Sequence, residues 1–162
     1  AEKYQAIMSE RIIAEPYLLL YSRRQDTKMY DMAKKIAKEK GLTIVNISLH
    51  TDADFGCIYK YSAGVEEFLS LIHYAEIVIT NSLHGSIFSV ILRKQFFVFP
   101  RIHGDKKIDK FLTLLNLEDR KVVDAEQEIP WQQQIDYKSV MSLLENYREK
   151  SIHYLKYISE LL

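Results

Sequence analysis

The chain contains few of the residues that build covalent cross-links and long linkers. Among its 162 residues there is one cysteine, Cys57, which excludes both an intramolecular disulfide framework and a cysteine-based zinc cluster. Five glycines and three prolines leave little room for extended linkers. No uninterrupted apolar run reaches the roughly 18 residues typical of a membrane-spanning helix. We therefore expect a soluble protein without a transmembrane segment, in a reducing compartment, the cytoplasm.

A net charge is also missing. The 22 lysines and arginines balance the 22 aspartates and glutamates, so no overall field attracts nucleic acid or an anionic membrane. The turn after the first expected strand, residues 21–26, has no glycine, which argues against a dinucleotide-binding fingerprint and a P-loop. The sequence has no His-Glu-x-x-His motif and no paired acidic metal motif. We expect no nucleic-acid partner, no metal and no cofactor.

The chain does contain enough apolar sequence for one domain with a full core, since 48% of its residues are hydrophobic. Short runs that are apolar throughout, typical of strands buried on both faces, alternate with patterns of helical period. The expected strands cover residues 17–21, 42–47, 77–80, 96–99 and 121–123. The expected helices cover residues 27–40, 65–74, 86–92, 106–116 and 137 to near the end.

This alternation predicts an α/β fold, with a parallel sheet of about five strands and helices on both of its faces. Numbered along the chain, the five strands are expected in the order 3-2-1-4-5. Residues 1–14 carry a loose helical spacing and are interpreted as a linker helix, which leaves residues 15–162 as the domain. Residues 50–63 lack a regular pattern and are expected to form a long loop.

The most informative segment is residues 77–92. Its β-branched start predicts a buried strand, and the polar residues Thr80, Asn81 and Ser82 favour a turn or a helix cap. His84 and Gly85 then lead into an apolar stretch that predicts a buried helix. In parallel sheets, ligands bind at the carboxyl ends of the strands, where helix N-termini point free N–H groups at anions. The segment therefore indicates an anion site, although a histidine that only caps its own turn would fit the same pattern.

Residues just past the ends of neighbouring strands would share one crevice in such a sheet. Arg23 and Arg101 offer planar donors to carboxylate and phosphate there, and Lys107 could face the same space. The N–H groups of Gly85 and Ser86 are expected to be free and to add their dipoles. A plainer interpretation places all three charges on solvated turns and helix ends.

Several other polar residues receive a structural interpretation. His50 and His103 are expected at the surface, and Arg120 in the solvated exit of a helix. Ser82 and His84 are too close in sequence to be read as a nucleophile and its base.

The strand–turn–helix segment resembles a known family. Residues 75–89 are similar to the pattern A-D-x-V-x-T-x-S-F-H-G-x-x-F-S of the polysaccharide pyruvyl transferase family, specifically of its C-terminal half. Further segments that match the family are residues 65–69, 95–101, 117–120 and the terminal helix.

The sequence departs from the family pattern at a few positions. Leu83 replaces a phenylalanine, which changes packing rather than chemistry. Gln95 replaces a proline and Asn116 a glycine. Lys107 stands where many members have arginine, which keeps the charge but loses the two-pronged donor.

The resemblance implies a two-domain enzyme similar to B-type glycosyltransferases, with the active site between two Rossmann-like halves. Such an enzyme transfers a pyruvyl group from phosphoenolpyruvate to two hydroxyls of a polysaccharide or glycan sugar and forms a ketal. This chain would be the donor-binding half, with the acceptor-binding N-terminal domain missing. Alone, it would be inactive, and its face toward the other half would be partly apolar.

For this reaction we expect His84 to be the catalytic residue, either as the proton donor or as a ligand of the phosphate. The expected substrate-binding residues are Asn81, Ser82, Gly85, Ser86, Arg23, Arg101 and Lys107.

Two other kinds of function remain open at this point. A glycosyltransferase donor domain would hold a nucleotide diphosphate-sugar at the same edge of the sheet. A non-catalytic flavodoxin-like binding module is less favoured, because Ser22, Arg23 and Arg24 stand where a receiver of that kind has an acidic pair.

Overall fold

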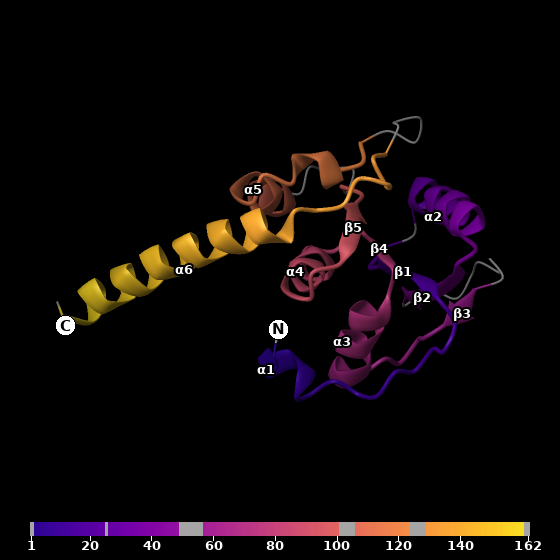
Figure 1. Cartoon of the computed structure of the whole chain (residues 1–162), viewed down its shortest axis with the longest axis horizontal. Coiled ribbons are helices and arrows are strands. Elements are labelled where there is room, and N and C mark those ends of the chain that lie inside the picture. Colours follow the sequence, from indigo (N-terminus) through magenta and orange to yellow (C-terminus); the bar gives the residue numbers. More distant parts are fainter. Residues whose placement is uncertain (1, 25, 49–56, 101–105, 124–128, 161–162) are drawn as a thin grey trace.

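The computed structural model describes residues 2–24, 26–48, 57–100, 106–123 and 129–160 and shows an α/β domain around one sheet (Figure 1). The strands are β1 (Tyr17–Ser22), β2 (Thr43–Ser48), β3 (Ile58–Tyr59), β4 (Ile77–Thr80) and β5 (Gln95–Val98). The helices are α1 (Glu2–Gln5), α2 (Thr27–Lys40), α3 (Val65–Tyr74), α4 (Leu83–Ile91), α5 (Lys106–Leu114), α6 (Tyr137–Glu160) and the 3₁₀ turn η1 (Glu118–Arg120). The sheet order is β3-β2-β1-β4-β5, and every neighbouring pair is parallel.

The central strand is β1, as its continuous apolar run predicts. Leu18, Leu19 and Leu20 are fully buried, because both faces of the strand are covered. Leu19 lies in register with Val45 of β2 on one side and Val78 of β4 on the other. The carboxyl ends of these parallel strands therefore lie at one edge of the sheet.

Helices cover both faces of the sheet, which confirms the predicted fold class. On one face, Met29 and Ile36 of α2 share a core with Leu18 and Leu20. On the other face, α3, α4, α5 and the start of α6 share a second core with β1, β4 and β5. Figure 1 shows α2 on the opposite side of the strands from α4, α5 and α6.

The predicted order of the named strands is wrong in two pairings. It places residues 77–80 beside residues 42–47, at the edge of the sheet, and residues 96–99 beside residues 17–21. In the structure β4, formed by those residues, pairs with β1, and β5 pairs with β4. The chain thus crosses from β3, at one edge, over α3 to the far side of β1, a connection that no local pattern in the sequence encodes.

Two short elements also differ from the expectation. β3 lies inside residues 50–63, which were expected to form a loop, and its two residues are too few to show a periodicity. Residues 121–123 form no strand of the sheet, and only a single bridge joins Lys121 to Val98. The fifth strand is therefore β3 rather than the C-terminal segment.

The expected helix over residues 1–14 is limited to α1. The segment that follows is held by long-range contacts instead of helical hydrogen bonds. The N–H of Ser9 donates to the carbonyl of Glu66 at 3.3 Å, and the hydroxyl of Ser70 donates to the carbonyl of Glu10 at 3.0 Å. Ile13 is buried in the core beneath α3 and α4. Tertiary contacts with α3 override the weak helical spacing of this segment.

Arg120, expected in a solvated position, is 2% exposed. Its guanidinium pairs with Asp119 at 2.9 Å and donates to the carbonyl of Gln133 at 3.0 Å. The same group lies 5.5 Å from the centre of the Phe97 ring. Because Phe97 lies in β5 and Gln133 in the segment before α6, Arg120 joins the C-terminal part of the chain to the sheet.

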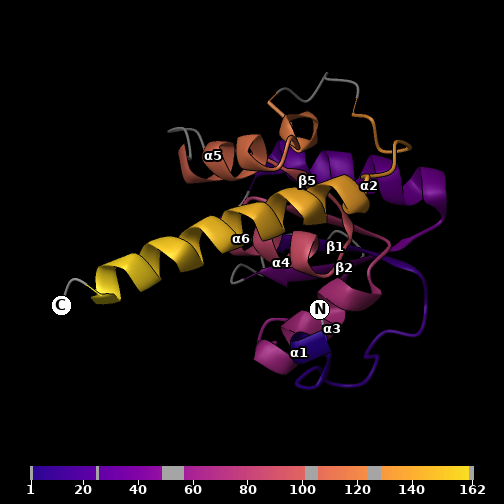
Figure 2. The ribbon, with the colours of Figure 1, turned by 60° about the vertical axis from the view of Figure 1, so that its left-hand side comes forward.

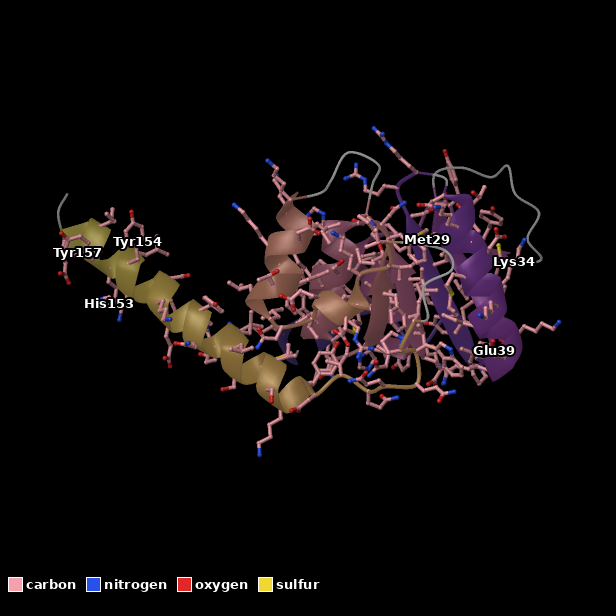
Figure 3. All side chains as sticks on the ribbon, turned by 90° about the horizontal axis from the view of Figure 1, so that it is seen from above. Met29, Lys34, Glu39, His153, Tyr154 and Tyr157 are labelled. Carbon is pink, nitrogen blue, oxygen red and sulfur yellow. The ribbon has the colours of Figure 1, made fainter. Side chains whose placement is uncertain are left out.

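The last helix extends well beyond the sheet (Figure 1, Figure 2). Val140 is the one buried residue of its 24. Tyr154, Leu155 and Tyr157, near its end, are mostly exposed, and Figure 3 shows Tyr154 and Tyr157 on the turns farthest from the strands. Among the described residues, no helix is both long enough and apolar enough to cross a membrane.

Replacing Arg120 with alanine should lower the free energy of unfolding by about 2–4 kcal/mol, because a buried side chain and charge-assisted hydrogen bonds are lost together. Chemical denaturation measures the change. Arg148→Ala is the matched control, because Arg148 makes an ion pair with Glu145 at 3.1 Å but is exposed on α6, and it should leave stability essentially unchanged. Equal, small effects of both substitutions would contradict the joining role of Arg120.

Candidate active site

The candidate site lies at the carboxyl edge of the sheet, where β4 passes into α4. The side chain of Thr80, at the last position of β4, holds this junction together. Its hydroxyl donates to the carbonyl of Tyr21 at 2.7 Å and accepts from the N–H of Ser82 at 3.0 Å. The end of β1 and the start of α4 are thereby bound to the same atom. Thr80 was not among the predicted site residues.

Asn81 connects the same junction to the bend after β1. Its Oδ1 accepts from the N–H of Arg23 at 2.9 Å, and its Nδ2 donates to the carbonyl of Arg24 at 3.0 Å. The residue is 3% exposed. Asn81, a residue predicted to bind substrate, thus holds the backbone of Arg23 beside the start of α4.

The N-terminus of α4 opens toward this edge with unsatisfied donors. Ser82 is its N-cap, and no side chain caps the helix. Ser86 N–H makes the first helical bond, to the carbonyl of Ser82 at 3.0 Å. Among the described residues, the N–H groups of Leu83, His84 and Gly85 therefore have no backbone acceptor. Of the two N–H groups expected to be free, that of Gly85 is free and that of Ser86 is not.

The hydroxyl of Ser82 is the second unsatisfied group at this helix end. The residue is 1% exposed, and among the described residues its Oγ has no hydrogen-bond partner. A buried hydroxyl without a partner is costly, which leaves Ser82 with an unsatisfied polar group at this helix end. Ser86, by contrast, is fully buried and donates its hydroxyl to the carbonyl of Ser82 at 3.1 Å.

Gly85 allows α4 to lie directly against the sheet. A Cβ added at this position would lie 2.4 Å from Thr80 Oγ1 and 2.9 Å from Tyr21 Cδ1. No side chain fits at those distances. The glycine therefore fixes how deeply the start of α4 sits at the strand ends.

The charged candidates that the structure describes lie at the surface. His84, in the first turn of α4, is exposed, and so are Arg23 after β1 and Lys107 in the first turn of α5. Among the described residues, none of these three side chains makes a hydrogen bond or an ion pair. Arg101 lies outside the described residues, as do His50 and His103.

The described residues include no group of three histidine, cysteine, aspartate or glutamate side chains that could hold a metal ion. The donors at the edge of the sheet are N–H groups, a hydroxyl and cationic side chains. This set is suited to phosphate or carboxylate oxygens.

The parallel sheet with helices on both faces defines a Rossmann-like α/β domain. Among solved structures, UDP-GlcNAc 2-epimerase from Methanocaldococcus jannaschii is similar, with a TM-score of 0.53 and 14% identity over 90% of this chain and 42% of that chain. A crystal structure of that enzyme in complex with UDP-GlcNAc and UDP has a TM-score of 0.45 and 12% identity, over 91% and 48%. The chain thus spans less than half of the length of these neighbours.

The family model of polysaccharide pyruvyl transferase matches residues 3–103, which include all five strands and the start of α4. This chain belongs to the polysaccharide pyruvyl transferase family. None of the curated proteins has a sequence that matches it.

Gly85→Ala should destabilise the domain by about 1–3 kcal/mol, the usual cost of overpacking, because Thr80 Oγ1 is held by two hydrogen bonds and cannot withdraw freely. Chemical denaturation measures the loss. Gly64→Ala is the control, because nothing lies within 4 Å of a Cβ at that helix start. If the two alanine variants were equally stable, the close approach of α4 would be refuted.

Proposed function

We propose that this chain is the donor-binding half of an enzyme that transfers a pyruvyl group from phosphoenolpyruvate to two hydroxyls of a glycan sugar. Membership of the polysaccharide pyruvyl transferase family supports the reaction class. The observation that carries the proposal is the N-terminus of α4, where free N–H groups and the unpartnered Ser82 hydroxyl lie beside exposed His84.

The reaction makes clear demands on such a site. The methylene carbon of phosphoenolpyruvate takes a proton, C2 becomes electron-poor, and two sugar hydroxyls add there as inorganic phosphate leaves. One of the two hydroxyl protons balances the proton taken by the methylene, and the other leaves with the phosphate. The site must therefore move a proton and hold a phosphate and a carboxylate on one small molecule.

The residues at the start of α4 fit these demands. The N–H groups of His84 and Gly85 and the hydroxyl of Ser82 donate to one anionic group of the donor. Arg23 and Arg101 supply planar donors that match phosphate or carboxylate oxygens. His84 either protonates the methylene carbon or binds the phosphate, since imidazole changes charge near neutral pH.

Three further residues complete the donor site in this proposal. Lys107 adds a cation from the start of α5. Asn81 orients the donor through the arginine-bearing bend that its side chain holds. Ser86 supports the first turn of α4 through its bond to the N-cap.

The sugar acceptor would bind to an N-terminal domain that these 162 residues do not include. The fraction of the epimerase that the chain spans, 42%, supports this interpretation. So do the exposed side chains of Tyr154, Leu155 and Tyr157 on α6, because a helix of this kind normally gains its stability by packing an apolar face. The enzyme would act in the cytoplasm.

In an enzyme that carries both halves, His84→Ala should lower the rate of pyruvyl transfer by at least about 10²-fold, the low end for loss of a general acid or base. The melting temperature should hardly change, because the side chain is exposed. Steady-state kinetics and a thermal melt measure the two effects. His153→Ala, an exposed histidine on α6, should change neither. A lowered melting temperature of His84→Ala with near-normal kinetics would instead make the histidine a turn cap.

Millimolar phosphoenolpyruvate should raise the melting temperature of the 162-residue chain by a few degrees without turnover, because ligand bound to the native state stabilises it by mass action. A uridine diphosphate-sugar is the matched probe and should give no shift. Protection by the nucleotide-sugar alone would favour a glycosyltransferase donor domain. Protection by neither compound would favour a non-catalytic binding module, and turnover by the chain alone would refute the half-enzyme interpretation.

A further inference from the structure

The bend after β1 carries two adjacent arginines. Their side chains are exposed, but their backbone is hydrogen-bonded. Arg23 and Arg24 are both exposed. Their backbone N–H and carbonyl, however, are bound by one carboxamide, that of Asn81, at 2.9 and 3.0 Å. The two hydrogen bonds span 58 and 57 residues of sequence.

We propose that Asn81 is a positioning residue. It holds the Arg23–Arg24 bend against the start of α4, so that the guanidinium groups reach an anion bound there, and it does not touch that anion itself. This inference rests on the proposed function, because it concerns how the same site receives the phosphate or carboxylate of phosphoenolpyruvate.

The occupied polar atoms of Asn81 separate positioning from direct binding. Both of these atoms already have partners on the bend. A direct ligand would present a free polar atom, as Ser82 does one residue later. Asn81 can therefore influence an anion only through the residues that it holds.

The other contacts around the bend do not hold it against the start of α4. Asp26 accepts from the N–H of Met29 at 3.1 Å and so caps α2, on the far side of the bend. The hydroxyl of Ser22 lies 3.2 Å from that of Tyr30, also on α2. Within the described part of the chain, these contacts tie the bend to α2, whereas those of Asn81 tie Arg23 and Arg24 to the start of α4.

A bend that is ordered before the anion binds lowers the entropic cost of binding. A flexible bend would lose conformational freedom when its guanidinium groups close on an anion, and a bend that is already ordered loses less. Loss of Asn81 should therefore weaken the binding of the donor, and the loss should vanish once the arginines are removed.

The first test needs no ligand. In Asn81→Ala, the amide of Arg23 loses its acceptor and should exchange its hydrogen about tenfold faster, whereas amides in the middle of α2 should not change. Ser70→Ala is the matched control: its hydroxyl also joins distant segments, α3 and the carbonyl of Glu10, but away from the bend. It should leave Arg23 exchange unchanged. Unchanged exchange in Asn81→Ala would overturn the inference whatever the ligand.

The second test measures binding of phosphoenolpyruvate, with inorganic phosphate as a second probe, by titration calorimetry. We compare Asn81→Ala, the pair Arg23→Ala with Arg24→Ala, and the triple variant. Asn81→Ala should raise the Kd about tenfold, and the triple variant should bind no more weakly than the arginine pair, because the effects share one route. Ser70→Ala should bind as the unchanged chain does.

The outcomes separate this inference from the proposed function. Faster exchange with non-additive binding losses supports both. Faster exchange with losses that add in the triple variant overturns positioning through the arginines but leaves the donor site in place. If the unchanged chain binds phosphate but not phosphoenolpyruvate, the proposed donor is wrong, and the phosphate series then decides positioning by the same criterion. If it binds neither probe, both the donor site and the positioning role at it are overturned.

Discussion

One hydroxyl group connects the parts of this domain on which the candidate site depends. Thr80 ends β4, donates its hydroxyl to the carbonyl of Tyr21 in β1 and accepts from the N–H of Ser82, the N-cap of α4. Gly85 lies against the same side chain, so the first turn of α4 sits as close to the sheet as backbone allows. Thr80 thus contacts β1, the N-cap of α4 and Gly85, and these contacts fix where α4 begins relative to the sheet. If that hydroxyl moved, the start of α4 would no longer be held to the end of β1, from which the bend with Arg23 and Arg24 continues.

The unsatisfied groups at the site follow from this arrangement. Because the residues before α4 are strand and turn rather than helix, their carbonyls do not accept from the first N–H groups of the helix. The hydroxyl of Ser82, at the N-cap, is buried and has no partner among the described residues. The unsatisfied hydrogen-bonding groups therefore lie where the parallel strands end, the place where α/β proteins bind ligands. In a chain of the polysaccharide pyruvyl transferase family, this capacity is suited to the anionic donor that we propose.

Local patterns predicted much of the fold and failed where distant contacts decide. The helix over 27–40 was predicted at its observed bounds from its helical period. In the structure Asp26 caps its start and Gly41, with a φ of 64°, ends it. β3 was missed, since two residues carry no period, and its existence depends on pairing with β2. The helix expected over residues 1–14 gave way to contacts with α3. The order of the strands depends on crossovers, so the position of β4 beside β1 could not be read from any single segment.

The sequence by itself determined that a hydroxyl-rich turn with a histidine joins a buried strand to a buried helix, because strand and helix periods and turn chemistry act over a few residues. Only the tertiary structure decided which of these polar groups are hydrogen-bonded within the protein and which are exposed or unsatisfied. Asn81 and Ser86 have hydrogen-bonded side chains, and His84 is exposed. Within the described part of the chain, the hydroxyl of Ser82 has no partner. Arg120, which resembles any charged helix exit in sequence, is buried against β5. The reason is physical: a hydrogen bond between residues 58 apart exists only after strand pairing brings them together.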